Sequence, residues 1–245
     1  MLLFKYRDLS VDVNDSLARL QQILRAQAFW AANADSLNDP QEFFWDVDYF
    51  PSSNTITYLA VALSRHRGWE SEEAQKIATH AVRQERVEVF AAPIVDALQH
   101  RFREEIGLVC FGRSPDNPTL WERYAASGYG VCVQLEVPDN LMSKQLHDVK
   151  YVDDKTLHVD NFLQASGELG AGPLYEMALL TKPSAWADEE EIRFVSKKHS
   201  VPIRLRNSRV TKLVIGDKLP LEVRSKLERL VADLPYALPL AQREA

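Results

Sequence analysis

Apolar residues recur along the chain with two different spacings, which separate helix-like from strand-like stretches. Residues 13–27 carry leucine or isoleucine at positions 17, 20, 23 and 24, and this spacing predicts an amphipathic helix. A longer helical block covers residues 54–104, where we expect about three helices. Further helices are predicted at 120–126, within 156–180 and at 220–234.

Short apolar runs with frequent β-branched and aromatic residues predict the strands. They lie at residues 2–7, 29–32, 106–111, 130–135, 149–152, 191–195, 201–205 and 210–215. Strands and helices do not alternate regularly, and this order is typical of an α+β fold rather than a βαβ fold. The pattern therefore predicts a single mixed α+β domain over residues 1–236, with short strands around a helical insertion at about 54–104. Residues 237–245 are expected to form a flexible tail.

Composition supports a globular protein, since 46% of the residues are hydrophobic and 26% are charged. No apolar stretch has the length needed to span a bilayer, and the apolar start is too short for a signal peptide. Both cysteines, Cys110 and Cys132, lie in apolar runs without Cys-x-x-Cys spacing. We therefore expect a cytoplasmic protein with two reduced core cysteines and no membrane association.

Charge is distributed unevenly along the chain. The net charge is −6, but residues 192–230 hold eleven Lys or Arg against three acids. That segment carries +8, and the remainder carries −14. A basic face of this kind fits a protein or nucleic-acid partner with many negative charges. The alternative is a solvated face that pairs with the acidic remainder.

Several familiar sites are missing from the sequence. It has no Gly-x-Gly-x-x-Gly fingerprint, no phosphate-binding Gly-Lys-Ser/Thr loop and no Gly-x-Ser-x-Gly elbow. The six histidines show no metal-ligand spacing, so no metal is expected.

Four clusters join polar residues to aromatic ones. They are Phe4-Lys-Tyr-Arg7, Leu37-Asn-Asp-Pro-Gln-Glu42, Leu120-Trp-Glu-Arg-Tyr124 with Gly128-Tyr-Gly-Val-Cys132, and Lys182 followed by Trp186-Ala-Asp-Glu-Glu-Glu-Ile-Arg193. In order and spacing they resemble the bacterial family catalogued as domain of unknown function 2971, over most of the chain. That resemblance by itself implies no activity.

The fourth cluster contains a Glu-x-Glu pair at the start of a predicted strand. Residues two apart in a strand face the same side, so Glu189 and Glu191 are expected to project together and Glu190 away from them. This arrangement more distantly resembles the mono-ADP-ribosyltransferases, which consume NAD. In that chemistry a carboxylate stabilises the cationic character of the ribose as nicotinamide leaves.

The resemblance implies a catalytic role for Glu191, with Glu189 beside it, and a first-strand role for Arg7 at the pyrophosphate. Tyr124 or Trp121 would supply the aromatic face. We expect Arg7, Asp39, Tyr124, Glu191 and Arg193 to border a common cleft. The full set of expected NAD-binding residues is Tyr6, Arg7, Asn38, Asp39, Trp121, Tyr124, Lys182, Trp186 and Arg193.

Other interpretations of the same residues stay open. The chain could be a non-catalytic nucleotide- or nucleic-acid-binding module, of the kind found in bacterial defence, with Arg7 and Arg193 on phosphate. It could also be a magnesium-dependent nuclease that uses Asp39, Glu189 and Glu191. Each cluster also has a purely structural interpretation: Asn38-Asp39-Pro40 as a turn, Trp121 and Tyr124 as core, and the glutamates as ion-pair partners of Arg193 or Lys182.

Overall fold

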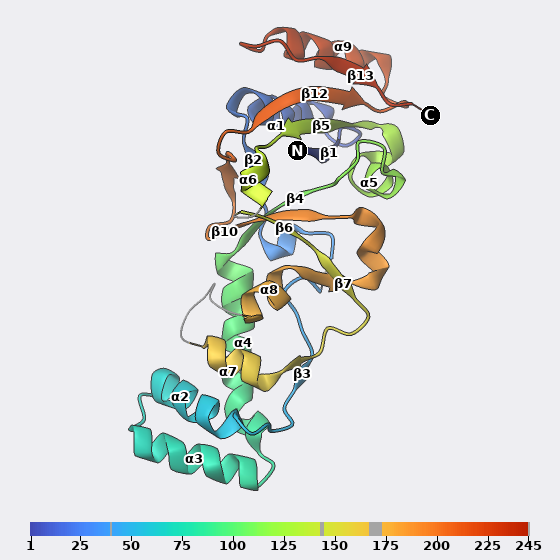
Figure 1. Ribbon diagram of the computed structural model, residues 1–245. Helices are drawn as coiled ribbons and strands as arrows, with labels where there is room; N and C mark the ends of the chain where they lie inside the picture. Colours follow the sequence, from blue (N-terminus) through green and yellow to red (C-terminus); the bar gives the residue numbers. More distant parts are fainter. Residues whose placement is uncertain (40, 143–144, 167–172, 245) are drawn as a thin grey trace. The chain divides into compact units, whose positions relative to one another are not determined.

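The computed structural model describes residues 1–39, 41–142, 145–166 and 173–244 (Figure 1). It confirms the α+β class, because helices and several small sheets alternate irregularly along the chain. Contacts divide the chain into two compact units. Unit 1 comprises Met1–Ala32, Gly107–Val149 and Ala185–Ala245, and unit 2 comprises Asn33–Ile106 and Lys150–Ser184. The extent of a single domain stays a prediction.

A four-stranded sheet forms the centre of unit 1. Its strand order is β1 (Leu2–Asp8), β5 (Gly130–Glu136), β12 (Arg209–Ile215) and β13 (Leu240–Gln242). The first three strands are antiparallel neighbours, and β13 pairs in parallel with β12 (Figure 1). Part of the predicted tail is therefore a paired strand.

The two faces of this sheet bury different cores. Helices α1 (Val13–Ala26) and α9 (Leu221–Ala232) share a core with alternate sheet residues such as Leu3, Val131 and Val133. Helix α5 (Pro118–Tyr124) shares the other core with the intervening residues, Phe4, Tyr6 and Cys132. Because side chains alternate along a strand, the register of β1 decides which of its polar residues meets which helices.

Local sequence signals mark the first residues of α5 and α9. Asn117 accepts a hydrogen bond from the Leu120 backbone N–H at 3.1 Å, and Pro118 occupies the first turn, so α5 begins where a capping residue and a proline favour it. Helix α9 begins directly after Pro220, its N-cap residue, without a side-chain capping hydrogen bond.

A second sheet of unit 1 has the order β4 (Gly107–Phe111), β10 (Ile192–Ser196) and β6 (Leu146–Asp148). Phe4 and Gly112 exchange two backbone hydrogen bonds of 3.1 and 2.8 Å, which join this sheet to β1. A two-stranded pair, β2 (Phe29–Ala31) with β11 (Val201–Ile203), is joined to β4 through a bridge between Ala32 and Leu108. Unit 1 also contains 3-10 helix η2 (Ala126–Gly128) and the short α6 (Asp139–Met142).

Unit 2 is mainly helical. Helices α2 (Thr55–Arg67) and α3 (Ser71–Arg83) lie side by side (Figure 1), and α4 (Val87–Glu105) follows them. Helices α7 (Val159–Ala165) and α8 (Pro173–Leu179), with 3-10 helix η1 (Ala34–Ser36), complete its helical part. Two parallel pairs of short strands join β3 (Val47–Asp48) to β8 (Leu157–His158) and β7 (Lys150–Val152) to β9 (Thr181–Pro183).

Candidate functional site

The predicted site residues fall into both units. Unit 1 contains Tyr6, Arg7, Trp121, Tyr124, Trp186, Glu189, Glu191 and Arg193, whereas unit 2 contains Asn38, Asp39 and Lys182. Pro40, the third residue of the predicted turn, lies outside the described residues.

The Glu-x-Glu segment does not have the strand geometry that the sequence predicts. Glu189 ends 3-10 helix η3 (Ser184–Glu189), Glu190 has the left-handed φ of 46°, and β10 begins only at Ile192. Strand alternation consequently does not relate Glu189 to Glu191. Both are nevertheless buried, and Glu190 is exposed, because the left-handed residue turns the chain between them.

Glu191 forms a buried ion pair with Arg193. The Arg193 Nε donates to Glu191 Oε1 at 2.7 Å, and a second guanidinium nitrogen lies 3.4 Å from Oε2. Glu191 is 5% exposed and Arg193 is fully buried. A charge-assisted pair of this kind satisfies both groups inside a protein, and it corresponds to the structural interpretation of Glu191.

Glu189 belongs to a group that we call the Glu189 cluster, formed by Arg123, Tyr124, Trp186 and Glu189. Its Oε1 accepts hydrogen bonds from Arg123 at 3.0 Å and from the Tyr124 hydroxyl at 2.9 Å. The Arg123 guanidinium also lies 4.5 Å from the centre of the Trp186 ring. Trp186 thus helps to position Arg123, which in turn binds the Glu189 carboxylate. The sequence singled out the Trp-Glu-Arg-Tyr motif without assigning a role to Arg123.

Tyr6 and Trp121 belong to the core beside α5. Their rings meet edge to face with centroids 5.3 Å apart. The Tyr6 hydroxyl donates to the Ser114 carbonyl at 2.6 Å, and the Trp121 indole donates to the Pro115 carbonyl at 2.7 Å. Burial raises the pKa of Tyr6, so its hydroxyl stays neutral. Both side chains are satisfied where they lie and anchor the loop before α5.

Lys5 and Arg7, the β1 cation pair, belong to the opposite face of β1, the face of Leu3 and helix α1. The Arg7 Nε is buried and has no hydrogen-bond partner among the described residues. Burial lowers the pKa of Arg7, and the charge of Arg19 on α1 lowers it further. Arg7 is therefore a half-buried cation with one desolvated N–H group and with another cation as its neighbour, which is an unfavourable environment for a positive charge.

Lys5 interacts electrostatically with Arg7 and with the carboxylates of Glu189 and Glu191. Its Nζ donates to the Cys110 carbonyl at 2.9 Å. Burial lowers the pKa of Lys5 to about 8; Arg7 also lowers it, while Cys110, Glu191 and Glu189 act in the opposite direction. Both glutamates are therefore near enough to act on the Lys5 ammonium. The sequence could have revealed Lys5, because it lies two residues before Arg7 on a predicted strand.

In unit 2, Asp39 is 4% exposed, and its Oδ1 accepts a hydrogen bond from the Gln41 backbone at 2.9 Å. Asp39 Oδ2 is buried without a hydrogen-bond partner in the described part of the chain. Asn38 is exposed, and Lys182, on β9, is 4% exposed and therefore buried. The interpretation of Asn38-Asp39-Pro40 as a turn stays a prediction, because Pro40 lies outside the described residues.

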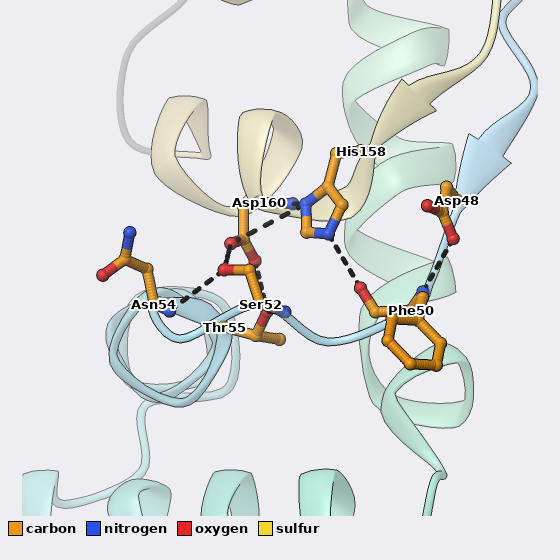
Figure 2. A network of polar contacts seen from close by, with 7 residues as sticks. All are labelled: Asp48, Phe50, Ser52, Asn54, Thr55, His158 and Asp160. Atoms are coloured by element: carbon orange, nitrogen blue, oxygen red, sulfur yellow. Dashed lines mark hydrogen bonds and ion pairs between the residues drawn. The ribbon is translucent and has the colours of Figure 1, made fainter.

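A polar network that the sequence did not indicate joins β8 and α7 to the start of α2 (Figure 2). His158 Nε2 bonds to the Phe50 carbonyl at 2.7 Å, and its Nδ1 accepts from the Asp160 backbone N–H at 3.1 Å. The Asp160 carboxylate accepts from Thr55 Oγ1 at 2.7 Å and from Ser52 Oγ at 2.5 Å. The carboxylate, and not the imidazole, contacts the serine, so the order of a Ser-His-Asp triad is not met. This network caps α7 and fixes the entry to α2.

Within residues 1–39, 41–142, 145–166 and 173–244 no group of three or more His, Cys, Asp or Glu is arranged to hold a metal ion. In the same ranges no helix is long and apolar enough to cross a membrane. Neither Cys110 nor Cys132 forms a disulfide with any residue that the structure describes. Burial raises the pKa of Cys132, so this thiol stays protonated and behaves as a small core residue.

Comparison with known proteins adds no relative on which the site could be assigned: no family model matches the chain, and neither a curated protein nor a solved structure matches it. Membership of the domain of unknown function 2971 family, and the more distant resemblance to mono-ADP-ribosyltransferases, thus stay predictions that rest on the four sequence clusters.

Proposed function

We propose that unit 1 binds the phosphate groups of a nucleotide through the β1 cation pair, Lys5 and Arg7. One observation carries this proposal: the Arg7 Nε is buried, has no hydrogen-bond partner among the described residues, and lies near the like charge of Arg19. Arg7 as a whole is half-buried, but a buried guanidinium N–H without an acceptor costs free energy. A phosphate oxygen would supply both the acceptor and the opposite charge, and guanidinium groups suit phosphate geometry.

Arg193, the second arginine expected at the phosphate, is not part of this proposal. It is fully buried and already holds Glu191, so a ligand would have to break that pair to reach it.

The test is the variant Arg7→Met, with ADP binding measured by calorimetry. A hydrogen bond to a charged group contributes about 1.5–3 kcal/mol, so we expect affinity to fall by about 10- to 150-fold. The melting temperature should stay equal or rise, because methionine keeps the apolar stem and removes a desolvated charge. Arg209→Met is the matched control, since Arg209 pairs with Glu136 on the surface. Equal ADP affinity of the Arg7 variant and wild type would contradict the proposal.

Lys5 should make the affinity for ADP depend on pH. Because the pKa of Lys5 lies at about 8, its charge is present below that pH and is lost above it. We expect ADP affinity to fall as pH rises from 7.5 to 9.5, a range in which the charge of ADP is constant. A bound anion favours the charged lysine, so the midpoint should lie above 8. In Lys5→Met the affinity should be lower at pH 7.5 and independent of pH; a slope that survives this substitution would exclude Lys5.

A second candidate is NAD consumption of the ADP-ribosyltransferase kind, with Glu191 or Glu189 as the carboxylate. One observation favours this candidate: the charges of Glu191 and Glu189 both raise the pKa of Lys5. The two carboxylates are therefore close to the proposed phosphate site. Nicotinamide release from NAD separates turnover from binding alone. The magnesium-dependent nuclease hypothesis also needs Asp39, which lies in unit 2. Cleavage of a polynucleotide that depends on magnesium would support it.

The proposal includes a cytoplasmic location and a polyanionic acceptor or partner for the basic segment 192–230. The two cysteines form no disulfide among the described residues, which supports the location, and the uneven charge of the chain supports the partner.

A further inference from the structure

Within the basic segment, one stretch of unit 1 has positive charge that no acid neutralises. Residues 197–208 contain no Asp or Glu, and four of their cations are exposed: Lys197, Lys198, Arg204 and Arg206. None of these four side chains forms an ion pair with any residue that the structure describes. Other cations of the segment differ: Arg209 pairs with Glu136, Arg224 with Glu228, and Lys226 with Glu222.

The backbone that carries these cations is anchored. Ser200 donates to the Ala31 carbonyl at 2.7 Å, and the Lys198 backbone N–H donates to Ser196 Oγ at 3.1 Å. The turn also packs closely on β4, where a Cβ added to Gly107 would lie 2.5 Å from the Lys198 carbonyl oxygen. The charged side chains therefore extend from a fixed scaffold.

An exposed tryptophan lies beside the same stretch. Trp30 on β2 is opposite Pro202 on β11, and its neighbours Phe29 and Ala31 are buried. Because side chains alternate along a strand, Trp30 and Pro202 share the outer face of this strand pair. Trp30 is 50% exposed, although tryptophan rings favour burial.

We propose that these six residues, the β11 surface, dock single-stranded nucleic acid. The four cations would neutralise phosphates, and the Trp30 ring would stack on an unpaired base. A single strand fits better than a duplex because its bases are free to stack on a protein side chain. The stretch from Lys197 to Arg206 spans at most about 30 Å of chain, which suits a site of a few nucleotides. This inference does not depend on the nucleotide site at Arg7.

The experiment measures anisotropy of a labelled twenty-nucleotide oligo-dT at several salt concentrations. In a variant with Gln at positions 197, 198, 204 and 206, we expect at least tenfold weaker binding in low salt. The slope of log affinity against log salt should fall by about 3, since each lost phosphate contact on a single strand contributes about 0.7. The matched control replaces Arg209, Arg224 and Lys226 by Gln; these ion-paired cations should matter little.

Trp30 tests the base contact separately. Trp30→Ala should weaken binding by about tenfold, whereas Trp30→Phe keeps a stacking ring and should retain most of the affinity. Absence of oligo-dT binding by wild type in low salt would overturn the proposal, as would equal binding by the four-site variant. Poly-glutamate is the competing probe: if it displaces oligo-dT equally well at equal charge, and its own binding also needs Trp30, the surface takes an acidic protein instead.

Discussion

Glu191→Gln is expected to lower the free energy of unfolding by about 3–5 kcal/mol, because the substitution breaks the buried ion pair between Glu191 and the fully buried Arg193. For a chain of this size the melting temperature should fall by about 6–20 °C. Thermal melting checks this directly. Nicotinamide release from NAD should be followed on the same samples, at a temperature where both proteins are folded.

Two further variants make this result interpretable. Glu190→Gln removes the neighbouring exposed carboxylate, so its melting temperature should match that of wild type. The double variant Glu191→Leu/Arg193→Met removes both charges and should recover much of the lost stability. If Glu191→Gln melts like wild type and nicotinamide release is lost, the carboxylate is catalytic and our structural assignment of the pair is wrong.

Gly130→Ala should destabilise the protein by about 3 kcal/mol, at the upper end for overpacking, because backbone atoms would have to move. A Cβ at this position would lie 2.1 Å from the Arg7 carbonyl oxygen and 3.0 Å from the Ala125 Cα. The strand pair β1–β5 would separate at Arg7, so ADP affinity should fall together with the melting temperature. Denaturant unfolding and calorimetry measure the two effects.

Gly68→Ala is the control for this substitution. Gly68 ends α2 with a φ of 68°, and a Cβ there would meet nothing within 4 Å. Its expected cost is only the left-handed conformation, about 1–2 kcal/mol, with ADP affinity unchanged. Gly130 does not have a left-handed φ, so a cost of Gly130→Ala no larger than that of Gly68→Ala would contradict the predicted overpacking against the Arg7 carbonyl.

The elements with strong periodicity could be predicted from the sequence. Helix α1 and strand β5 lie within one or two residues of their predicted bounds, because each buries a regular apolar stripe. Strands β3 and β8 could not, since two-residue strands have no period and exist only through their pairing with each other. For the predicted helical region 156–180, α7 and α8 are observed, and residues 167–172 lie outside the description.

The candidate site was less predictable, for reasons that particular residues show. The left-handed Glu190 breaks the alternation from which Glu189 and Glu191 were expected to project together. Tyr6 and Arg7 are adjacent in sequence but belong to opposite faces of β1, so the first cluster divides between two environments. Pairings such as Arg123 with Glu189 join residues 66 positions apart, and no local pattern encodes them.

The parallel strand β13 has a consequence for the solution behaviour of the chain. It covers the outer backbone edge of β12, whose residues Leu213, Val214 and Ile215 are buried. A chain shortened before Leu240 would present that edge as a row of open amide and carbonyl groups beside apolar side chains. Such edges recruit strands from other molecules. Strand β13 therefore protects this edge of β12 from pairing with strands of other molecules.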